Sequence, residues 1–132
     1  MIHIVVHGFD SFKLKALLKL IYRRLAGVTI EYLDWFDFIK RYDRTNTLFY
    51  LDPPYFGVED YCGKDLFKRE DYQTMSTLLV QLKGQFLLFL NDVPEIRKTF
   101  SQFNIKEVNI SYTCGSKNQP PAQKLIISNC DF

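Results

Sequence analysis

The sequence predicts a three-layer α/β domain, in which helices cover both faces of a mainly parallel sheet that ends in an antiparallel edge hairpin. Three observations support this fold class. Short apolar runs alternate with amphipathic helical patterns, two of the apolar runs end abruptly in polar residues, and the last two β-type runs flank a polar loop. With 132 residues and 47% hydrophobic content, the chain fits a single domain, residues 1–132.

The N-terminal part predicts strand, helix and strand in that order. Residues 1–8 form a short apolar run that indicates a first strand. Asp10-Ser11 offers an N-cap for a helix that ends at Gly27, and its apolar side chains recur at helical spacing: Leu14, Leu17, Leu18, Ile21 and Leu25. Residues 28–32 are short and rich in β-branched side chains, which favours a second strand.

The central part predicts two buried strands. A short helix at residues 35–40 precedes a continuously apolar run at 48–51, as expected for a strand covered on both faces. Asp52-Pro53-Pro54 must end that strand because proline cannot donate to the ladder. A second buried strand at 86–90 ends at Asn91-Asp92, and between the two strands lies a helical face that stops at Gly84: Tyr72, Met75, Leu78, Leu79 and Leu82.

The C-terminal part predicts one helix and a hairpin. Asp92 is placed to cap a helix that has Pro94 in its first turn and buries two apolar side chains, Ile96 and Phe100. Residues 105–112 and 124–128 then indicate two antiparallel strands around a polar loop.

Composition narrows the class of protein only slightly. A net charge of +2 is too mild to indicate nucleic-acid binding by itself. Cys62, Cys114 and Cys130 are odd in number and lack zinc-site spacing, so we expect free thiols and no metal site, and His3 and His7 show no partner pattern. Neither a membrane span nor a signal peptide is evident, which favours a cytoplasmic protein.

Polar side chains follow the two central strands at the point where each strand ends. Ligands of open α/β sheets bind beyond the carboxyl ends of the strands, so we expect Asp52 and Asn91 to share one crevice. An apolar strand that runs into Asp52-Pro53-Pro54-Tyr55 resembles the signature of amino-methyltransferases, which methylate an exocyclic amine of adenine or cytosine. Taken alone, the tetrapeptide fits a strand-terminating turn equally well.

The flanking sequence makes the resemblance more specific. It is similar to the Dam-type adenine-specific DNA methyltransferases of phages and prophages, over about residue 12 to residue 129. The similar segments are 24–31, 38–43, 47–51, 83–86, 91–95 and 125–129. The resemblance implies a Rossmann-like methyltransferase fold, S-adenosylmethionine as the cofactor and DNA as a partner. A cytosine or RNA amine stays open as the target, because the motif's chemistry serves any exocyclic amine.

The resemblance also assigns roles within the motif. The lone pair of an adenine amine is delocalised into the ring, and the Asp52 carboxylate and the Pro53 carbonyl accept hydrogen bonds that oppose this delocalisation. Pro53 and Pro54 restrict the backbone before Tyr55. Tyr55 stacks on the target base after the base has been flipped out of the duplex, and Phe56 is expected at the substrate as well.

Further positions are implied at the edges of this site. Asp34-Trp35 matches where relatives place a polar residue and an aromatic ring against the cofactor's adenine, and Asp52 and Asn91 are the other expected cofactor contacts. Phe67 and Asp71 lie where the family has residues near the cofactor and target base. The residues alone also allow purely structural interpretations. Asp34 and Trp35 fit a helix cap followed by a core tryptophan, and Phe67 and Asp71 fit a core aromatic followed by an acid in the first turn of a helix.

We expect the chain to be only the C-terminal part of such a catalytic domain. Full-length relatives begin with a strand and a Gly-rich cofactor loop, followed by a target-recognition region, and the isolated Gly8 and Gly27 do not supply that loop. Activity should then need a separate chain that carries the Gly-rich half. We expect the bare sheet edge to be covered by residues 1–6 or by a second copy in a homodimer. The alternative is an inactive remnant that acts as a structural or weak nucleic-acid-binding module.

Overall fold

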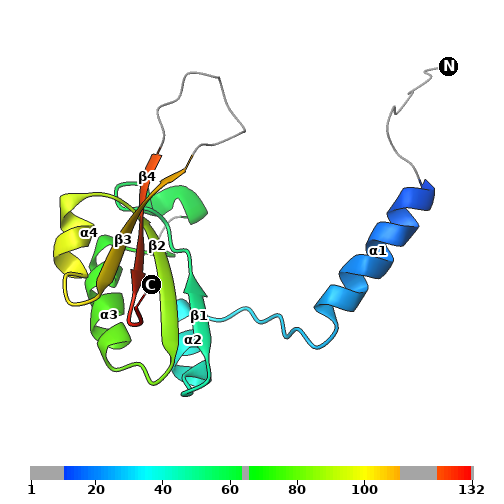
Figure 1. Cartoon of the computed structure of the whole chain (residues 1–132), viewed down its shortest axis with the longest axis horizontal. Helices are drawn as coiled ribbons and strands as arrows, with labels where there is room; N and C mark the ends of the chain where they lie inside the picture. Colours follow the sequence, from blue (N-terminus) through cyan, green and yellow to red (C-terminus); the bar gives the residue numbers. More distant parts are fainter. Residues whose placement is uncertain (1–10, 64–65, 111–121, 132) are drawn as a thin grey trace. The chain divides into compact units, whose positions relative to one another are not determined.

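The computed structural model describes residues 11–63, 66–110 and 122–131 (Figure 1). The chain divides into two compact units, Met1–Leu33 and Asp34–Phe132. The expected strand at residues 1–8, the expected edge cover by residues 1–6, and most of the polar loop after residue 110 lie outside the described residues. So do His3, His7 and Cys114.

The first unit contains one described helix, α1 (Ser11–Leu25). It ends before Gly27, as predicted, because Gly27 has a φ of +84° and glycine adopts this left-handed region at little cost. The strand predicted at residues 28–32 is wrong. A strand needs a neighbour for its backbone groups, and within the described part of the chain these residues join no ladder; Ile30 and Tyr32 are 84% and 99% exposed.

The described residues of the second unit form a four-stranded sheet in the order β1-β2-β4-β3. Its strands are β1 (Leu48–Leu51), β2 (Gln85–Asn91), β3 (Asn104–Ile110) and β4 (Ala122–Ser128). β1 runs parallel to β2, whereas β4 is antiparallel to both β2 and β3. The sheet is therefore mixed, not mainly parallel, because the β3–β4 hairpin places β4 directly against β2.

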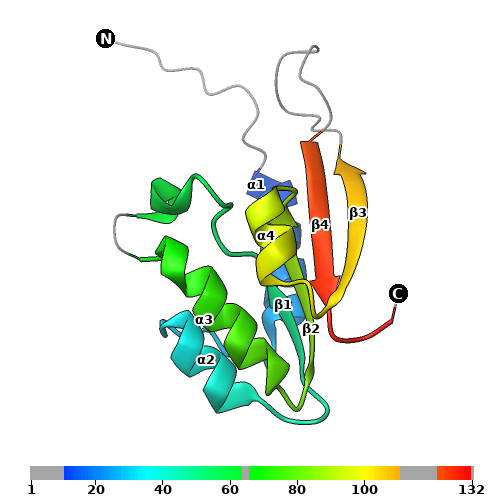
Figure 2. The same ribbon diagram turned by 90° about the vertical axis from the view of Figure 1, so that its left-hand side faces the viewer.

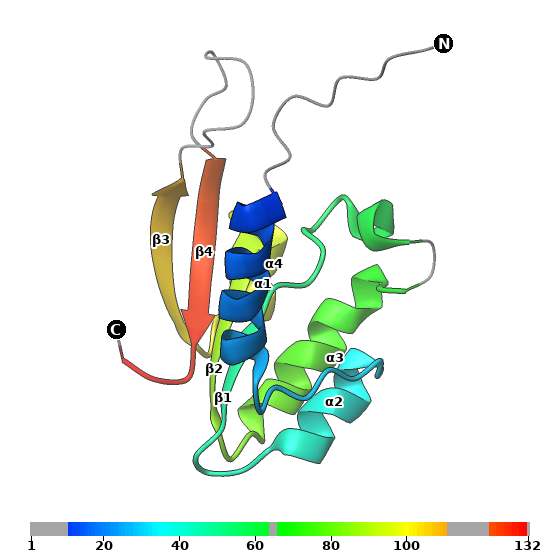
Figure 3. The same ribbon diagram turned by 90° about the vertical axis from the view of Figure 1, so that its right-hand side faces the viewer.

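The helices of the second unit lie on one face of this sheet (Figures 2 and 3). They are α2 (Trp35–Tyr42), α3 (Arg69–Val80) and α4 (Pro94–Thr99), with a 3-10 turn, η1 (Glu59–Cys62), before α3. Alternate residues of β2 point toward the helices and are fully buried, namely Phe86, Leu88 and Leu90. They share one core with side chains from all three helices: Ile39, Met75, Leu79 and Ile96.

The expectation that β1 is covered on both faces is wrong. Phe49 points into the core, but Leu48 and Tyr50 are 59% and 69% exposed. Among the described strands β1 stands at the edge of the sheet, and its alternate side chains point away from the helical layer. The Tyr50 ring packs on Phe89 of β2, with ring centroids 4.6 Å apart. An apolar patch of β1 and β2 thus lies on the face opposite α2, α3 and α4.

α4 buries Ile96 and Phe100, as predicted, but Asp92 does not cap it. The N-cap residue is Val93, which makes no side-chain capping bond. The Asp92 carboxylate instead accepts hydrogen bonds of 2.6 and 2.7 Å from the Arg97 guanidinium. The guanidinium offers the carboxylate two parallel charge-assisted hydrogen bonds from an opposite charge, which accounts for its turn to Arg97.

Gly84 brings the starts of β1 and β2 together. A Cβ atom here would lie 2.6 Å from the Thr47 carbonyl oxygen, so only glycine allows this approach. The Asp43 carboxylate accepts hydrogen bonds from the N–H groups of Lys83 and Gly84, at 2.9 Å each. These contacts fix the parallel pairing that brings the ends of both strands to the same edge.

Candidate functional site

A cavity of about 340 Å³ opens at the carboxyl end of β1. Asp52, Pro53 and Pro54 line it together with Trp35 and Phe67. The remaining lining residues are largely apolar: Phe38, Tyr50, Leu51, Leu66 and Met75. The structure therefore gathers three residues of the sequence motif and two predicted aromatic residues around one space.

Trp35 reaches the cavity because it is the first residue of α2. The Asp34 carboxylate caps this helix by accepting a hydrogen bond from the Phe36 N–H at 2.9 Å. The Trp35 ring lies 6.0 Å, centroid to centroid, from the ring of Phe67. Asp34 is thus a helix cap whose side chain does not line the cavity, whereas Trp35 forms part of the wall.

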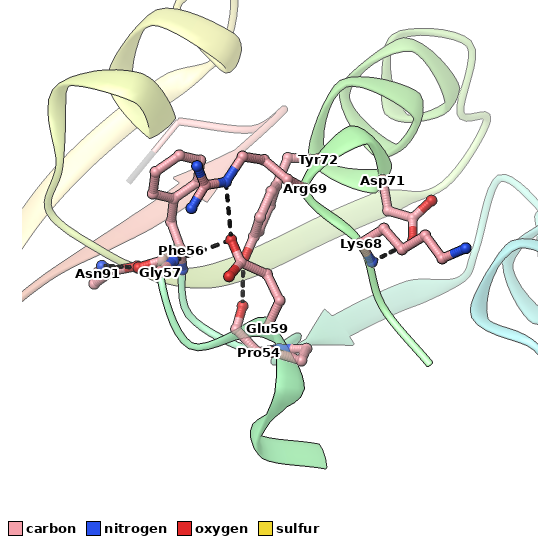
Figure 4. Close-up of polar contacts among 9 residues, drawn as sticks. All are labelled: Pro54, Phe56, Gly57, Glu59, Lys68, Arg69, Asp71, Tyr72 and Asn91. Atoms are coloured by element: carbon pink, nitrogen blue, oxygen red, sulfur yellow. Dashed lines mark hydrogen bonds and ion pairs between the residues drawn. The ribbon is translucent and has the colours of Figure 1, made fainter. Parts of the chain in front are cut away.

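Phe67 lies just before α3, and its ring packs on Tyr72 at 4.9 Å between centroids. The Asp71 carboxylate accepts a 2.7 Å hydrogen bond from the Lys68 N–H, which fixes the first turn of α3 (Figure 4). Asp71 does not line the cavity. Asp71 therefore fixes the start of α3, the helix that follows Phe67.

Tyr55 has different surroundings from the rest of the motif. It is half-buried and does not line the cavity. The Lys124 ammonium nitrogen lies 4.7 Å from the centroid of the Tyr55 ring. Lys124 is the register partner of Asn91 in the β2–β4 pair. The motif thus passes from the cavity at Asp52 to the side of β4 at Tyr55.

Two side chains hold the backbone of the motif segment (Figure 4). The Asn91 amide accepts a hydrogen bond from the Phe56 N–H at 2.9 Å and donates one to the Phe56 carbonyl at 3.0 Å. Tyr72 of α3 donates its phenolic hydrogen to the Pro54 carbonyl at 2.8 Å. The sequence predicts that Asp52 and Asn91 share one crevice, but only Asp52 lines the cavity, and the backbone contacts of Asn91 and Tyr72 are not predicted.

The contact from Tyr72 has a recognisable signal in the sequence. Tyr72 stands on a helical face whose other members are aliphatic or Met, and a buried tyrosine hydroxyl usually finds a hydrogen-bond partner. Burial raises the pKa of the Tyr72 phenol above its ordinary value. The hydroxyl therefore stays protonated and available as a donor to Pro54.

A carboxylate closes the turn after the motif. Glu59 accepts a 3.0 Å hydrogen bond from the Gly57 N–H and pairs with Arg69 at 3.4 Å. The hydrogen bond from Gly57 is the main cause that lowers the pKa of Glu59 below its ordinary value. The Arg69 guanidinium also lies 4.5 Å from the centroid of the Phe56 ring. These contacts connect the turn to α3 (Figure 4).

Comparison with known proteins identifies the family. The model of the D12 class N6 adenine-specific DNA methyltransferases matches residues 8–114, well over half of the chain. No curated protein matches the chain. Among the described residues, no helix is long and apolar enough to cross a membrane. The matched residues include the cavity, the motif and the side chains that hold it, and the chain belongs to the D12 class N6 adenine-specific DNA methyltransferase family.

Proposed function

We propose that this chain binds the target amine in the transfer of a methyl group from S-adenosylmethionine to the exocyclic amine of adenine in DNA. The observation that carries the proposal is the cavity that Asp52, Pro53 and Pro54 line together with Trp35 and Phe67. Its aromatic walls suit a planar purine ring, and its carboxylate suits an amine. Family membership supports the same reaction.

The chemistry explains why an acceptor belongs at this place. Adenine's amine nitrogen is a weak nucleophile while its lone pair is shared with the ring. By accepting hydrogen bonds from the N–H groups, the Asp52 carboxylate and the Pro53 carbonyl localise that lone pair and orient the nitrogen. S-adenosylmethionine, when bound, supplies a methyl group on a positively charged sulfur. Transfer would form a bond between the amine nitrogen and the methyl carbon and break the carbon–sulfur bond, and the surplus amine proton would leave to solvent.

We propose separate places for the two adenine rings. Trp35, on the helix that Asp34 caps, is our candidate for the cofactor's ring, and Phe67 forms the adjoining wall. Tyr55 and Phe56 are our candidates for stacking with the flipped target base. The Lys124 ammonium group beside Tyr55 supports this assignment, since a cation there attracts the anionic DNA backbone.

We further propose that the chain completes a three-layer Rossmann-like domain with a separate chain that carries the Gly-rich cofactor half. Within the described residues β1 pairs only with β2, and Leu48 and Tyr50 are exposed beside its outer edge. An open apolar edge favours pairing with another strand. A homodimer through the same edge is the competing arrangement, and light scattering of the purified chain distinguishes a dimer from a monomer.

Titration with S-adenosylhomocysteine, followed by a methyl-transfer assay on unmethylated adenine-containing DNA, tests the function. Trp35 is the only tryptophan, so its fluorescence reports binding at the cavity. We expect Asp52→Ala to abolish transfer, while the control Asp60→Ala, at an exposed acid of η1, retains it. The assay is run with the chain alone and with a polypeptide that supplies a Gly-rich cofactor-binding half.

The outcomes separate the alternatives. Transfer that needs the second polypeptide supports the split enzyme, and transfer by the chain alone shows a self-sufficient one. Absence of binding and transfer in both settings would identify an inactive remnant that acts as a structural or weak nucleic-acid-binding module. Equal transfer by Asp52→Ala and the control would remove Asp52 from the reaction.

A further inference from the structure

We propose that Asn91 is a positioning residue, which holds the motif segment 52–56 through the backbone of Phe56 and does not contact the cofactor. This inference rests on the proposed function and adds a role that the motif alone does not contain. Asn91 is the last residue of β2, so its backbone is fixed by the sheet, with the neighbouring Leu90 fully buried. The side chain therefore extends from a rigid support toward the segment after β1.

The two hydrogen bonds act on a single residue. Asn91 accepts from the Phe56 N–H at 2.9 Å and donates to the Phe56 carbonyl at 3.0 Å. Because both backbone groups of Phe56 are bound, the residue can neither move away nor rotate its flanking peptides without losing a bond. Only a side chain with an acceptor and a donor side by side satisfies both groups, which an amide does and a carboxylate at neutral pH does not.

A second anchor comes from another element. Tyr72 of α3 holds the Pro54 carbonyl at 2.8 Å, and β1 ends in the sheet just before Asp52. The segment is thus fixed at its start, at Pro54 and at Phe56 (Figure 4). These three points determine how Asp52 faces the cavity while Tyr55 turns toward Lys124.

The geometry does not favour a cofactor role for Asn91. Its side chain is absent from the cavity lining that contains Asp52 and Trp35. One amide oxygen lone pair and one amide hydrogen are already used on Phe56. The amide keeps a second lone pair and a second hydrogen, so it is the absence of Asn91 from the cavity lining that speaks against a cofactor contact.

Asn129 provides a matched control in the same molecule. It accepts a hydrogen bond from the Phe86 N–H at 3.1 Å and donates one to the Gly84 carbonyl at 2.9 Å. This amide therefore makes the same pair of bonds at the opposite end of β2, away from the motif. Asn129→Ala removes equivalent bonds and leaves the segment 52–56 untouched.

Amide hydrogen exchange tests the contact without any activity. We expect Asn91→Ala to speed exchange of the Phe56 amide about tenfold, which corresponds to one lost hydrogen bond. The Phe86 amide should keep its rate in that variant. In Asn129→Ala, the Phe86 amide should exchange faster and the Phe56 amide should keep its rate. An unchanged Phe56 rate in Asn91→Ala would overturn the proposal.

Asn91→Asp adds a test by pH. At neutral pH the introduced carboxylate lacks a donor and repels the Phe56 carbonyl, so the Phe56 amide should exchange faster than in the wild type. Once protonated, near pH 4 or below, the carboxylic acid can donate to that carbonyl and accept from the N–H. Protection of Phe56 relative to Phe86 should then return. A pH-independent loss of protection would count against a backbone clamp.

Steady-state kinetics of the active form, alone or with the second polypeptide, tests positioning directly. We expect Asn91→Ala to lower kcat for methyl transfer about 10- to 100-fold, with the KM for S-adenosylmethionine unchanged, because the displaced group is the amine acceptor. A raised KM at constant kcat would make Asn91 a cofactor ligand and overturn the inference. If the wild type transfers no methyl group in either setting, the proposed function fails, and the exchange measurements alone decide whether Asn91 holds the segment.

Discussion

The phenolic hydroxyl of Tyr72 lies 2.8 Å from the carbonyl oxygen of Pro54 and joins α3 to the segment after β1. Tyr72→Phe removes the donor and leaves a partly buried carbonyl without its partner. We expect the free energy of unfolding to fall by about 1–2 kcal/mol. Denaturant unfolding followed by Trp35 fluorescence measures this change. Tyr50→Phe, at an exposed tyrosine, should stay within about 0.5 kcal/mol of the wild type.

Gly84→Ala should destabilise the pairing of β1 with β2. The new Cβ atom would lie 2.6 Å from the Thr47 carbonyl oxygen and 2.8 Å from that of Arg44. Neither backbone can yield cheaply, because the Asp43 carboxylate holds the Gly84 N–H. We expect a loss of about 1–3 kcal/mol in thermal or chemical unfolding. Gln85→Ala, at the neighbouring exposed position, is the control, and equal stability of the two variants would contradict this account.

Stability should depend on pH through Asp92 and Arg97. Hydrogen bonds from Arg97 lower the pKa of the Asp92 carboxyl below its ordinary value. The stabilisation is therefore fully present above the ordinary aspartate pKa and is lost as pH falls through the lowered one. In Asp92→Asn, the free energy of unfolding should fall less than in the wild type as the pH is lowered from neutral to below about 4. Glu95→Gln removes an exposed carboxylate of α4 and should keep the pH dependence of the wild type.

The exposed edge of β1 should govern association with another chain. Leu48→Lys puts a charge on the face that carries Tyr50 and Phe89, and charged residues at sheet edges oppose pairing. We expect the variant to shift toward monomer in light scattering, or to lose stimulation by the polypeptide with the Gly-rich half. Val80, at the end of α3, is as exposed as Leu48, so Val80→Lys is the control. We expect it to change neither the association state nor the stimulation. Equal behaviour of both variants would place the interface elsewhere.

Local signals predict the elements of the second unit well. The bounds of β1 at Leu48–Leu51 agree with the prediction because an apolar run ends at residues that cannot continue a ladder, Asp52 and Pro53. α3 follows from apolar spacing, and the hairpin from two β-type runs around a polar loop. The strand at residues 28–32 was predicted wrongly, because β-branched content describes a suitable surface and not the presence of a partner strand.

Contacts between distant residues could not be predicted in the same way. The mixed order of the sheet depends on β4 pairing with β2, a choice that no local pattern specifies. The sequence predicts that Trp35 and Phe67 lie near Asp52, and the three residues line one cavity. It does not predict that Tyr55 lies beside Lys124. The backbone bonds of Asn91 depend on geometry that only the folded chain creates.

β2 carries an asparagine amide bond pair at each end, through Asn129 at Gly84 and Phe86 and through Asn91 at Phe56. A shift of one residue along the sheet would break all of these bonds and turn Phe86 and its alternate neighbours to the opposite face. Deletions or insertions within residues 85–91 should therefore be far less tolerated than substitutions there. The length of this strand, and not only its composition, is a requirement for bringing the end of β1 into place.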